Sequence, residues 1–191
     1  MPAETAPPME VTSAIQPDSA FLPVVESHSG QQVSRCYQCR KCTNGCPLAF
    51  AMDVMPNQVM RMIELGLRDE LLACRTIWVC ASCQTCTTRC PNDIGVARVM
   101  DALRQLSQEA GVPPAEPNVV KFHRAVLDSI RRHGRLFELG MVVGYKLATR
   151  DLLADAKLGW KMFKRGKLKF WPGSVRAKGE VRAMFDKQRK G

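Results

Sequence analysis

The feature that most constrains this chain is a run of cysteines that occurs twice. Each copy reads Cys-x-x-Cys-x-x-Cys-x-x-x-Cys-Pro, the first from Cys36 to Pro47 and the second from Cys80 to Pro91. Together the two copies contain eight of the nine cysteines in the 191 residues. A fold that gathers this many thiols in two equivalent sets must be organised around whatever the thiols bind.

The spacing within each copy is typical of a [4Fe–4S] cluster site. Three cysteines at every third position can bind three iron corners of a cubane from one short loop, and the fourth corner takes a thiolate from elsewhere. The proline after each fourth cysteine favours this, because proline cannot continue the loop's hydrogen bonding and turns the chain outward. In proteins with two such runs, the fourth cysteine of each run binds the other cluster. We therefore predict two [4Fe–4S] clusters, one held by Cys36, Cys39, Cys42 and Cys90 and the other by Cys80, Cys83, Cys86 and Cys46.

Three other uses of the cysteines compete with this interpretation. Zinc sites usually combine two separated Cys-x-x-Cys pairs, and the third cysteine of each run has no role in such a site. Disulfides would suit a small secreted protein, but the N-terminus has neither the basic region nor the unbroken apolar region of a secretory signal. The pattern leaves open a single cluster combined with structural thiols.

Composition limits the cellular setting. The sequence contains no run of about 18 or more apolar residues, so a membrane span is not expected. Nine cysteines in a chain without a secretory leader suit a reducing compartment, where thiols are committed to metal. We therefore expect a cytoplasmic protein.

Apolar residues recur at helical spacing along most of the chain. Between the cysteine runs, a helix is predicted to begin at Pro56. After the second run, Asn92 or Asp93 is expected to cap another helix. The residues expected on one face of that helix are Val96, Met100, Leu103, Ser107 and Ala110. Further helices are predicted over residues 116–133 and about 136–154, and because no strand pattern is convincing, the fold is predicted to be all-α.

These patterns divide the chain into four parts. Residues 1–33 contain five prolines among small and polar residues, which favours an extended or disordered arm. The apolar patch Phe21–Val25 in this arm would dock on a partner or lie as a strand-like fragment on its own domain, and we favour the second. Residues 34–112 would form an all-α domain that holds both cysteine runs, residues 113–160 a helical extension, and residues 161–191 a basic tail.

The tail carries most of the net positive charge. The formal net charge is +10, and residues 161–190 contain eleven Lys and Arg against two acidic residues. Large aromatic residues are interleaved with these charges at Trp160, Phe163, Phe170, Trp171 and Phe185. Such a mixture suits nucleic acid, an anionic membrane surface or an acidic protein, and a solvated tail is the plain alternative. Because the aromatic residues argue against full solvation, we favour docking to a partner protein.

Groups that could catalyse a reaction are scarce. The histidines, His28, His123 and His133, are scattered, and no nucleophile motif, phosphate-binding loop or dinucleotide fingerprint occurs. Clusters with four cysteine ligands each would leave no iron open to a substrate. Cys74, outside both runs, is expected to be a small buried apolar residue. The sequence therefore predicts an electron-transfer protein without catalytic residues, and we expect the bond-making to take place elsewhere.

The two cysteine runs differ in the charge around them. Arg35, Arg40 and Lys41 flank or lie within the first run, whereas Arg89 is the charged residue among neutral neighbours in the second. Positive charge near a cluster favours its more negative reduced state. The sequence therefore leads to the hypothesis that the cluster of the first run has the higher reduction potential.

Three stretches add a family resemblance to this picture: Cys36-Tyr-Gln-Cys39-Arg-Lys-Cys42-Thr-Asn-Gly-Cys46-Pro47, Leu65-Gly-Leu-Arg-Asp-Glu and Thr76-Ile-Trp-Val-Cys80. The chain resembles the C-type subunit of heterodisulfide reductase over about residues 33–160. The resemblance implies an α-helical ferredoxin fold with two [4Fe–4S] clusters. It also implies electron transfer from an A-type subunit, which contains flavin and iron–sulfur clusters, to a catalytic B-type subunit. In that family the B-type subunit reduces the coenzyme M–coenzyme B disulfide at noncubane clusters held by Cys-Cys-Gly motifs, and this chain contains no adjacent cysteines.

Other classes of protein share the duplicated cysteine pattern. One is the iron–sulfur subunit of a flavin dehydrogenase of the succinate, glycolate or glycerol-3-phosphate type, which often adds a [2Fe–2S] domain or Cys-Cys-Gly repeats. Another is a free dicluster ferredoxin, which is usually shorter and acidic. A third is a nucleic-acid-binding iron–sulfur protein, which we do not expect here.

Overall fold

The computed structural model describes residues 17–150, 161–162, 164–165, 173 and 175–188. Every regular element within these residues is a helix, so the predicted all-α fold is confirmed. The chain forms two compact units, residues 1–115 and residues 116–191. Both cysteine runs lie in the first unit.

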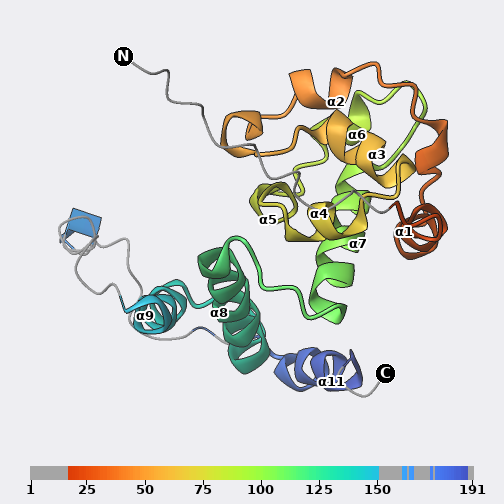
Figure 1. Cartoon of the computed structure of the whole chain (residues 1–191). Helices are drawn as coiled ribbons and strands as arrows, with labels where there is room; N and C mark the ends of the chain where they lie inside the picture. The colour runs from red at the N-terminus through yellow and green to blue at the C-terminus, as the bar shows by residue number, and fades with distance from the viewer. Residues whose placement is uncertain (1–16, 151–160, 163, 166–172, 174, 189–191) are drawn as a thin grey trace, which may run out of the picture. The chain divides into compact units, whose positions relative to one another are not determined.

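The first unit consists of short helices joined by loops (Figure 1). The helices before the second cysteine run are α1 (Phe21–Ser29), η1 (Val33–Arg35), α2 (Lys41–Asn44), η2 (Ala49–Ala51), α3 (Pro56–Glu64), α4 (Arg68–Ala73) and α5 (Thr76–Val79). The remaining two are α6 (Thr85–Thr88), which lies within the second run, and α7 (Val96–Glu109). The prediction that a helix begins at Pro56 is confirmed, with the proline in the first turn of α3.

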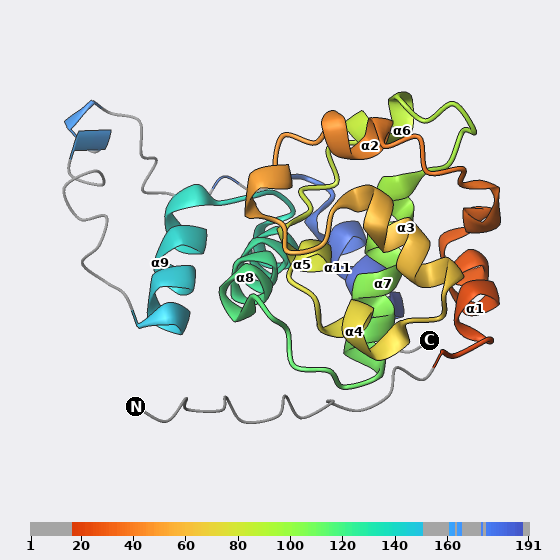
Figure 2. The ribbon, with the colours of Figure 1, turned by 45° about the horizontal axis from the view of Figure 1, so that its top comes forward.

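The core of this unit is built around α7, the longest of its helices. Figure 2 shows α7 passing beside α4 and α5, and it also contacts α1. Its buried face includes the predicted Val96, Met100, Leu103 and Ser107, whereas the predicted Ala110 is exposed at the end of the helix. Ser107 Oγ donates a hydrogen bond of 2.9 Å to the carbonyl of Leu72, so the hydroxyl is satisfied inside the core.

The cap predicted for α7 is wrong. Neither Asn92 nor Asp93 caps the helix, whose N-cap residue is Gly95 without a side-chain hydrogen bond. The Asn92 side chain donates instead to the carbonyl of Arg35, and the amide of Gly95 donates to Gln31 Oε1 at 2.5 Å. These two bonds join the segment before the first cysteine run to the segment after the second.

The arm predicted over residues 1–33 contains a packed helix where it is described. Residues 1–16 lie outside the described residues, and α1 follows from Phe21 with Phe21 and Val25 buried. Pro23 lies in the first turn of α1, where a missing N–H removes no intrahelical hydrogen bond. The apolar patch therefore does lie on its own domain, but as a helix rather than as a strand-like fragment.

The turn before α4 fixes the approach to α1. The amide of Asp18 donates to the carbonyl of Gly66 at 2.9 Å. Gly66 has a φ of +70°, and a Cβ atom there would lie 2.5 Å from the backbone oxygen of Asp18. Only glycine satisfies both the left-handed backbone and this close approach.

The second unit contains α8 (Pro117–His133), α9 (Glu138–Thr149) and α11 (Lys178–Gln188), and α8 contacts both of the others. Gly134 ends α8 with a φ of +74°, and its amide donates to the carbonyl of Ile130 at 2.7 Å. An ion pair of 2.6 Å between Arg131 and Asp186 joins α8 to α11. Among the described residues, no helix is long and apolar enough to cross a membrane.

Candidate iron–sulfur centres

The duplicated cysteine pattern adopts a duplicated backbone. Gln38 and Arg40 of the first run have φ values of +60° and +63°. Ser82 and Gln84 occupy the equivalent positions of the second run, with φ values of +50° and +62°. Each run then continues into a one-turn helix, α2 or α6. Non-glycine residues with positive φ are uncommon, so two pairs in matching positions indicate that the loop shape is itself required.

This loop shape suits an anionic cluster. Alternation of left-handed and right-handed residues turns successive backbone N–H groups toward one side, forming the concave nest that holds many phosphates and iron–sulfur clusters. The strained residues cost roughly 1–3 kcal/mol each. A fold retains such strain where ligand binding offsets it, which makes the two loops the first part of the candidate site.

The eight cysteines of the two runs line two largely enclosed cavities of the first unit. One cavity is lined by Cys36, Cys39, Cys42 and Cys90, together with Arg40, Asn57, Met60, Ile94 and Val96. The other is lined by Cys46, Cys80, Cys83 and Cys86, together with apolar residues that include Met52, Val96 and Met100. Each cavity therefore combines three cysteines of one run with the fourth cysteine of the other run. Val96 borders both cavities, so they are neighbours.

The two short helices explain how the fourth cysteines cross over. α2 and α6 contact each other (Figure 2), and each is followed two residues later by the fourth cysteine of its run. Gly45, just before Cys46, lies under the side chain of Arg89, just before Cys90. A Cβ atom on Gly45 would lie 2.7 Å from Arg89 Cδ. Close contact of the two helices at this point places each fourth cysteine beside the opposite loop.

The donor set fits cubane clusters. Among the described residues, no three His, Cys, Asp or Glu side chains gather around a single point as the ligands of one ion do. Each of the two cavities is lined by four cysteines together with apolar side chains, and four thiols are the donor set of a cluster with four irons. Cys74 is buried and borders neither cavity, as expected for the cysteine outside the runs.

The cysteines differ in exposure and in acidity. Cys39 and Cys83, the equivalent second cysteines of the two runs, are exposed, and Cys42 is buried. Burial raises the pKa of the thiols of Cys36, Cys42, Cys80 and Cys86 above the ordinary value. Hydrogen bonds from the hydroxyl and the amide of Thr85 lower the pKa of Cys83. Because the thiolate is the iron ligand, cluster binding must overcome this burial and release protons.

Sequence reasoning missed Asp53, which connects the two halves of the site. Asp53 Oδ1 accepts hydrogen bonds from the amide and the hydroxyl of Thr76, at 2.9 and 2.7 Å, and Oδ2 accepts one from the amide of Arg75 at 2.8 Å. Burial pushes the pKa of Asp53 upward, but these bonds and one from Val54 outweigh it and leave the pKa below its ordinary value. The carboxylate therefore anchors the start of α5, which leads directly into Cys80.

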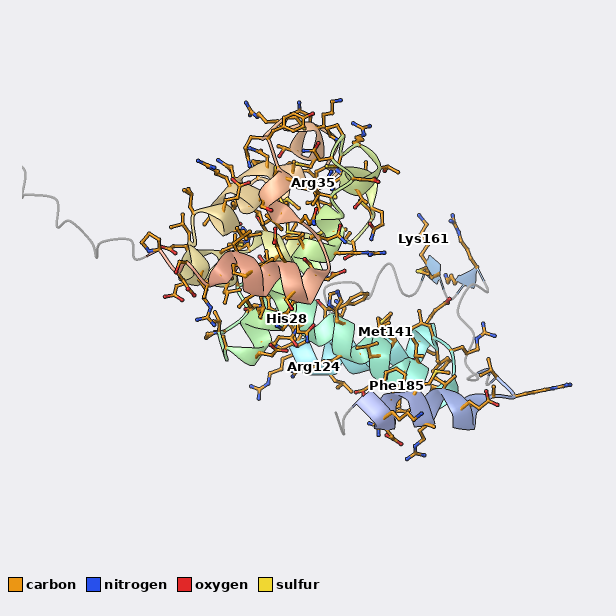
Figure 3. All side chains as sticks on the ribbon, turned by 90° about the vertical axis from the view of Figure 1, so that its right-hand side faces the viewer. His28, Arg35, Arg124, Met141, Lys161 and Phe185 are labelled. Atoms are coloured by element: carbon orange, nitrogen blue, oxygen red, sulfur yellow. The ribbon has the colours of Figure 1, made fainter. Side chains whose placement is uncertain are left out.

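The other sequence-derived candidates do not border the cavities. His28 and His123 are exposed and His133 is partly exposed, and none of them lines either cavity. His133 and the basic residues of α8 lie in the second unit, and Figure 3 labels one of these basic residues, Arg124. Trp160, Phe163, Phe170 and Trp171 of the predicted tail lie outside the described residues.

Comparison with known proteins agrees with this geometry. Residues 32–94 match the model of the 4Fe-4S dicluster domain family. Over 104 residues the chain is 34% identical to the C-type iron-sulfur subunit of the CoB–CoM heterodisulfide reductase of Methanopyrus kandleri, covering 54% of this chain and 51% of the relative. Over 106 residues it is 30% identical to the C-type subunit of the H2:CoB-CoM heterodisulfide,ferredoxin reductase of Methanothermobacter marburgensis, covering 55% and 57% of the two chains.

These comparisons confirm the family resemblance and the cofactor. The chain spans about half the length of the curated relatives it matches. The part that matches the dicluster domain family, residues 32–94, includes all eight cysteines of the two runs, and the chain carries two [4Fe–4S] clusters.

Proposed function

We propose that this iron–sulfur protein relays single electrons as the C-type subunit of a heterodisulfide reductase-like complex. The observation that supports the relay is the pair of neighbouring cavities, each bordered by four cysteines and both bordered by Val96. When bound, the clusters supply one-electron redox chemistry. The protein supplies the thiolates, the amide nests and an apolar wall that excludes water from between the two sites.

The proposed ligands follow the cavity linings. One cluster is held by Cys36, Cys39, Cys42 and Cys90, and the other by Cys80, Cys83, Cys86 and Cys46. Four cysteines per cluster leave no iron open to substrate, so the chain has no catalytic residue of its own. The reaction that consumes the electrons takes place on another subunit of the oxidoreductase.

The exposed cysteines mark where electrons arrive and leave. Cys39 at the first cavity and Cys83 at the second are both exposed, and Tyr37 beside Cys39 is 61% exposed. Each cluster therefore has an edge of its own that another protein can approach. In the proposed complex, an A-type subunit with flavin and iron–sulfur clusters delivers electrons, and a B-type subunit with Cys-Cys-Gly motifs uses them to reduce a disulfide.

The second unit is proposed as the part that docks to a partner subunit. Residues 116–191 contain nineteen Lys and Arg against seven Asp and Glu. A groove along α8 and α9 is bordered by the basic residues Lys121, Arg124 and Arg132, by His133, and by one acidic residue, Asp128. Figure 3 marks Arg124 on α8 and Met141 on α9, both of which border this groove. α9 also presents exposed Val142, Val143 and Leu147. A basic groove beside an apolar surface suits an acidic, amphipathic segment of a protein better than nucleic acid, which we do not expect as a ligand.

Anaerobic purification of the chain from its native cells, with mass spectrometry of what remains bound, tests the proposal. We expect a Cys-Cys-Gly protein and an iron–sulfur flavoprotein to co-elute at low salt, and to separate as salt screens the basic unit. Recovery with the flavin subunit of a dehydrogenase would favour that alternative. Elution alone, with two reducible clusters, would make the chain a free carrier. The thiols committed to clusters suit the cytoplasm, and cell fractionation tests this location.

A further inference from the structure

A single arginine connects the core helix α7 to the first cysteine of the second run. Arg104 Nε donates to the carbonyl of Ile77, and its Nη2 donates to the carbonyl of Cys80. Its Nη1 donates to Asp101 Oδ1 at 2.8 Å and reaches Ser82 Oγ at 3.5 Å. The fork of one guanidinium thus spans the end of α5 and the start of the loop that carries Cys80, Cys83 and Cys86.

The positioning role follows from the carbonyls involved. Ile77 lies in the four-residue helix α5, and Cys80 is its C-cap residue, so their carbonyls belong to the group that a helix end leaves without intrahelical partners. A planar guanidinium can bind two such oxygens in fixed directions, which a lysine ammonium cannot. Arg104 therefore holds the backbone of Cys80 in register with α7.

The electrostatic role follows from burial. The side chain of Arg104 is 14% exposed, whereas that of its ion-pair partner Asp101 is 51% exposed. Water and salt screen the exposed carboxylate more than the enclosed guanidinium. Of the two members of this ion pair, the guanidinium therefore has the stronger electrostatic effect on the second cavity. The cations of the first run, Arg35, Arg40 and Lys41, are all exposed, so solvent screens them more than Arg104, although Arg40 also borders the first cavity.

We propose that Arg104 is the positioning residue of the second cluster and raises its reduction potential, because an enclosed positive charge favours the state with one more electron. This inference changes the expectation drawn from the sequence, which considered only the charges flanking each run. It rests on the proposed ligand set of Cys80, Cys83, Cys86 and Cys46, and it does not depend on which partner accepts the electrons.

The test is an anaerobic redox titration of the full chain with both clusters, in which electron paramagnetic resonance measures the reduction of each cluster. Arg104→Gln is expected to shift one midpoint to more negative potential and to leave the other in place. Asp101→Asn removes the opposing charge and is expected to shift the same midpoint in the positive direction. Arg98→Gln is the matched control, because Arg98 lies exposed on the same helix, and neither midpoint should move.

Two further variants separate charge from geometry and from the ligand assignment. Arg104→Lys keeps the positive charge but cannot bind both carbonyls. The midpoint of the second cluster should therefore stay near its wild-type value, while an iron chelator should remove that cluster faster. Cys39→Ser marks the signal of the first cluster, and the midpoint that responds to Arg104 must be the other one. If Cys39→Ser and Arg104→Gln affect the same signal, the proposed ligand set is wrong.

The charge role is overturned if Arg104→Gln moves neither midpoint, if it moves both equally, or if Arg104→Lys shifts the midpoint as far as Arg104→Gln. Should Arg104→Gln fail to retain its iron, Asp101→Asn decides the question, since it leaves the guanidinium and its carbonyl partners intact. An unchanged midpoint in Asp101→Asn then contradicts the proposal.

Discussion

Two adjacent valines in α1 allow a direct test of whether this helix belongs to the dicluster domain. Val25 is completely buried, and Val24 is 39% exposed. Replacing either by Ala removes the same two methyl groups from the same helix. At Val25 the loss of apolar burial is about 1.6 kcal/mol at roughly 0.8 kcal/mol for each group, and the cavity left behind adds to it. The better helix propensity of Ala offsets up to about 0.6 kcal/mol of the lost stability at each position.

The expected net effect is a destabilisation of about 1.5–2 kcal/mol for Val25→Ala and a change near zero for Val24→Ala. Unfolding of a cluster protein is not a two-state process, so the assay is amide hydrogen exchange of the intact protein by mass spectrometry. A local opening that is easier by about 2 kcal/mol raises the exchange rate of α1 amides roughly thirtyfold. Equal exchange in the two variants would refute the packing of α1 on α7 and would restore the extended arm that the prolines suggested.

Three further predictions concern the turns and ligands of the site. Gly66→Ala is expected to destabilise the first unit more than Gly111→Ala, since both positions have positive φ but only Gly66 would also place a Cβ atom against backbone; the same exchange assay compares them. Asp53→Asn replaces one accepting oxygen by a donor, and at pH 7 α5 amides should exchange about fivefold faster, a loss of about 1 kcal/mol for this exposed carboxylate. Because the pKa of Asp53 is lowered by folding, its stabilisation is present at pH 7 and is lost only as pH falls through that lowered value, so wild type and variant should converge in acid. Cys46→Ala should remove the cluster of the second run rather than that of its own run. Electron paramagnetic resonance should therefore show the loss of one cluster signal in Cys46→Ala and of the other in Cys39→Ser. Loss of the same signal in both variants would contradict crossed ligation.

Local patterns in the sequence predicted the parts of the fold that depend on near neighbours. The helix that begins at Pro56 and the one over residues 116–133 have the expected type and nearly the expected ends, because apolar periodicity and first-turn prolines act within a few residues. The described α9 covers residues 138–149 of the predicted 136–154. The clusters were predictable for the same reason, since the spacing of each run encodes its own loop.

Features that depend on distant residues were not predictable in this way. The prolines of residues 1–33 suggested an arm, yet Phe21 and Val25 find a buried surface on helices much later in the chain. Asn92 resembles a helix cap, but its side chain bonds to the carbonyl of Arg35, 57 residues earlier. In both cases a tertiary contact outweighs a local preference, and no pattern within a short window records that contact.

The crossing of the fourth cysteines has a consequence for how this unit forms. In the proposed ligand set neither run encloses a cluster with its own four cysteines, because Cys46 and Cys90 each border the cavity of the opposite run. The strained loops and the buried thiols both oppose folding until iron is bound. Whichever cluster is bound first would hold α2 and α6 together, because its ligands come from both runs. The fourth cysteine of the other set would then already lie at its own cavity, so one cluster would prepare the site of the other. Folding and cluster assembly in residues 17–115 should therefore be a single cooperative process. Arg104 and Asp53 favour this process, because both hold the segment that leads into Cys80 in place.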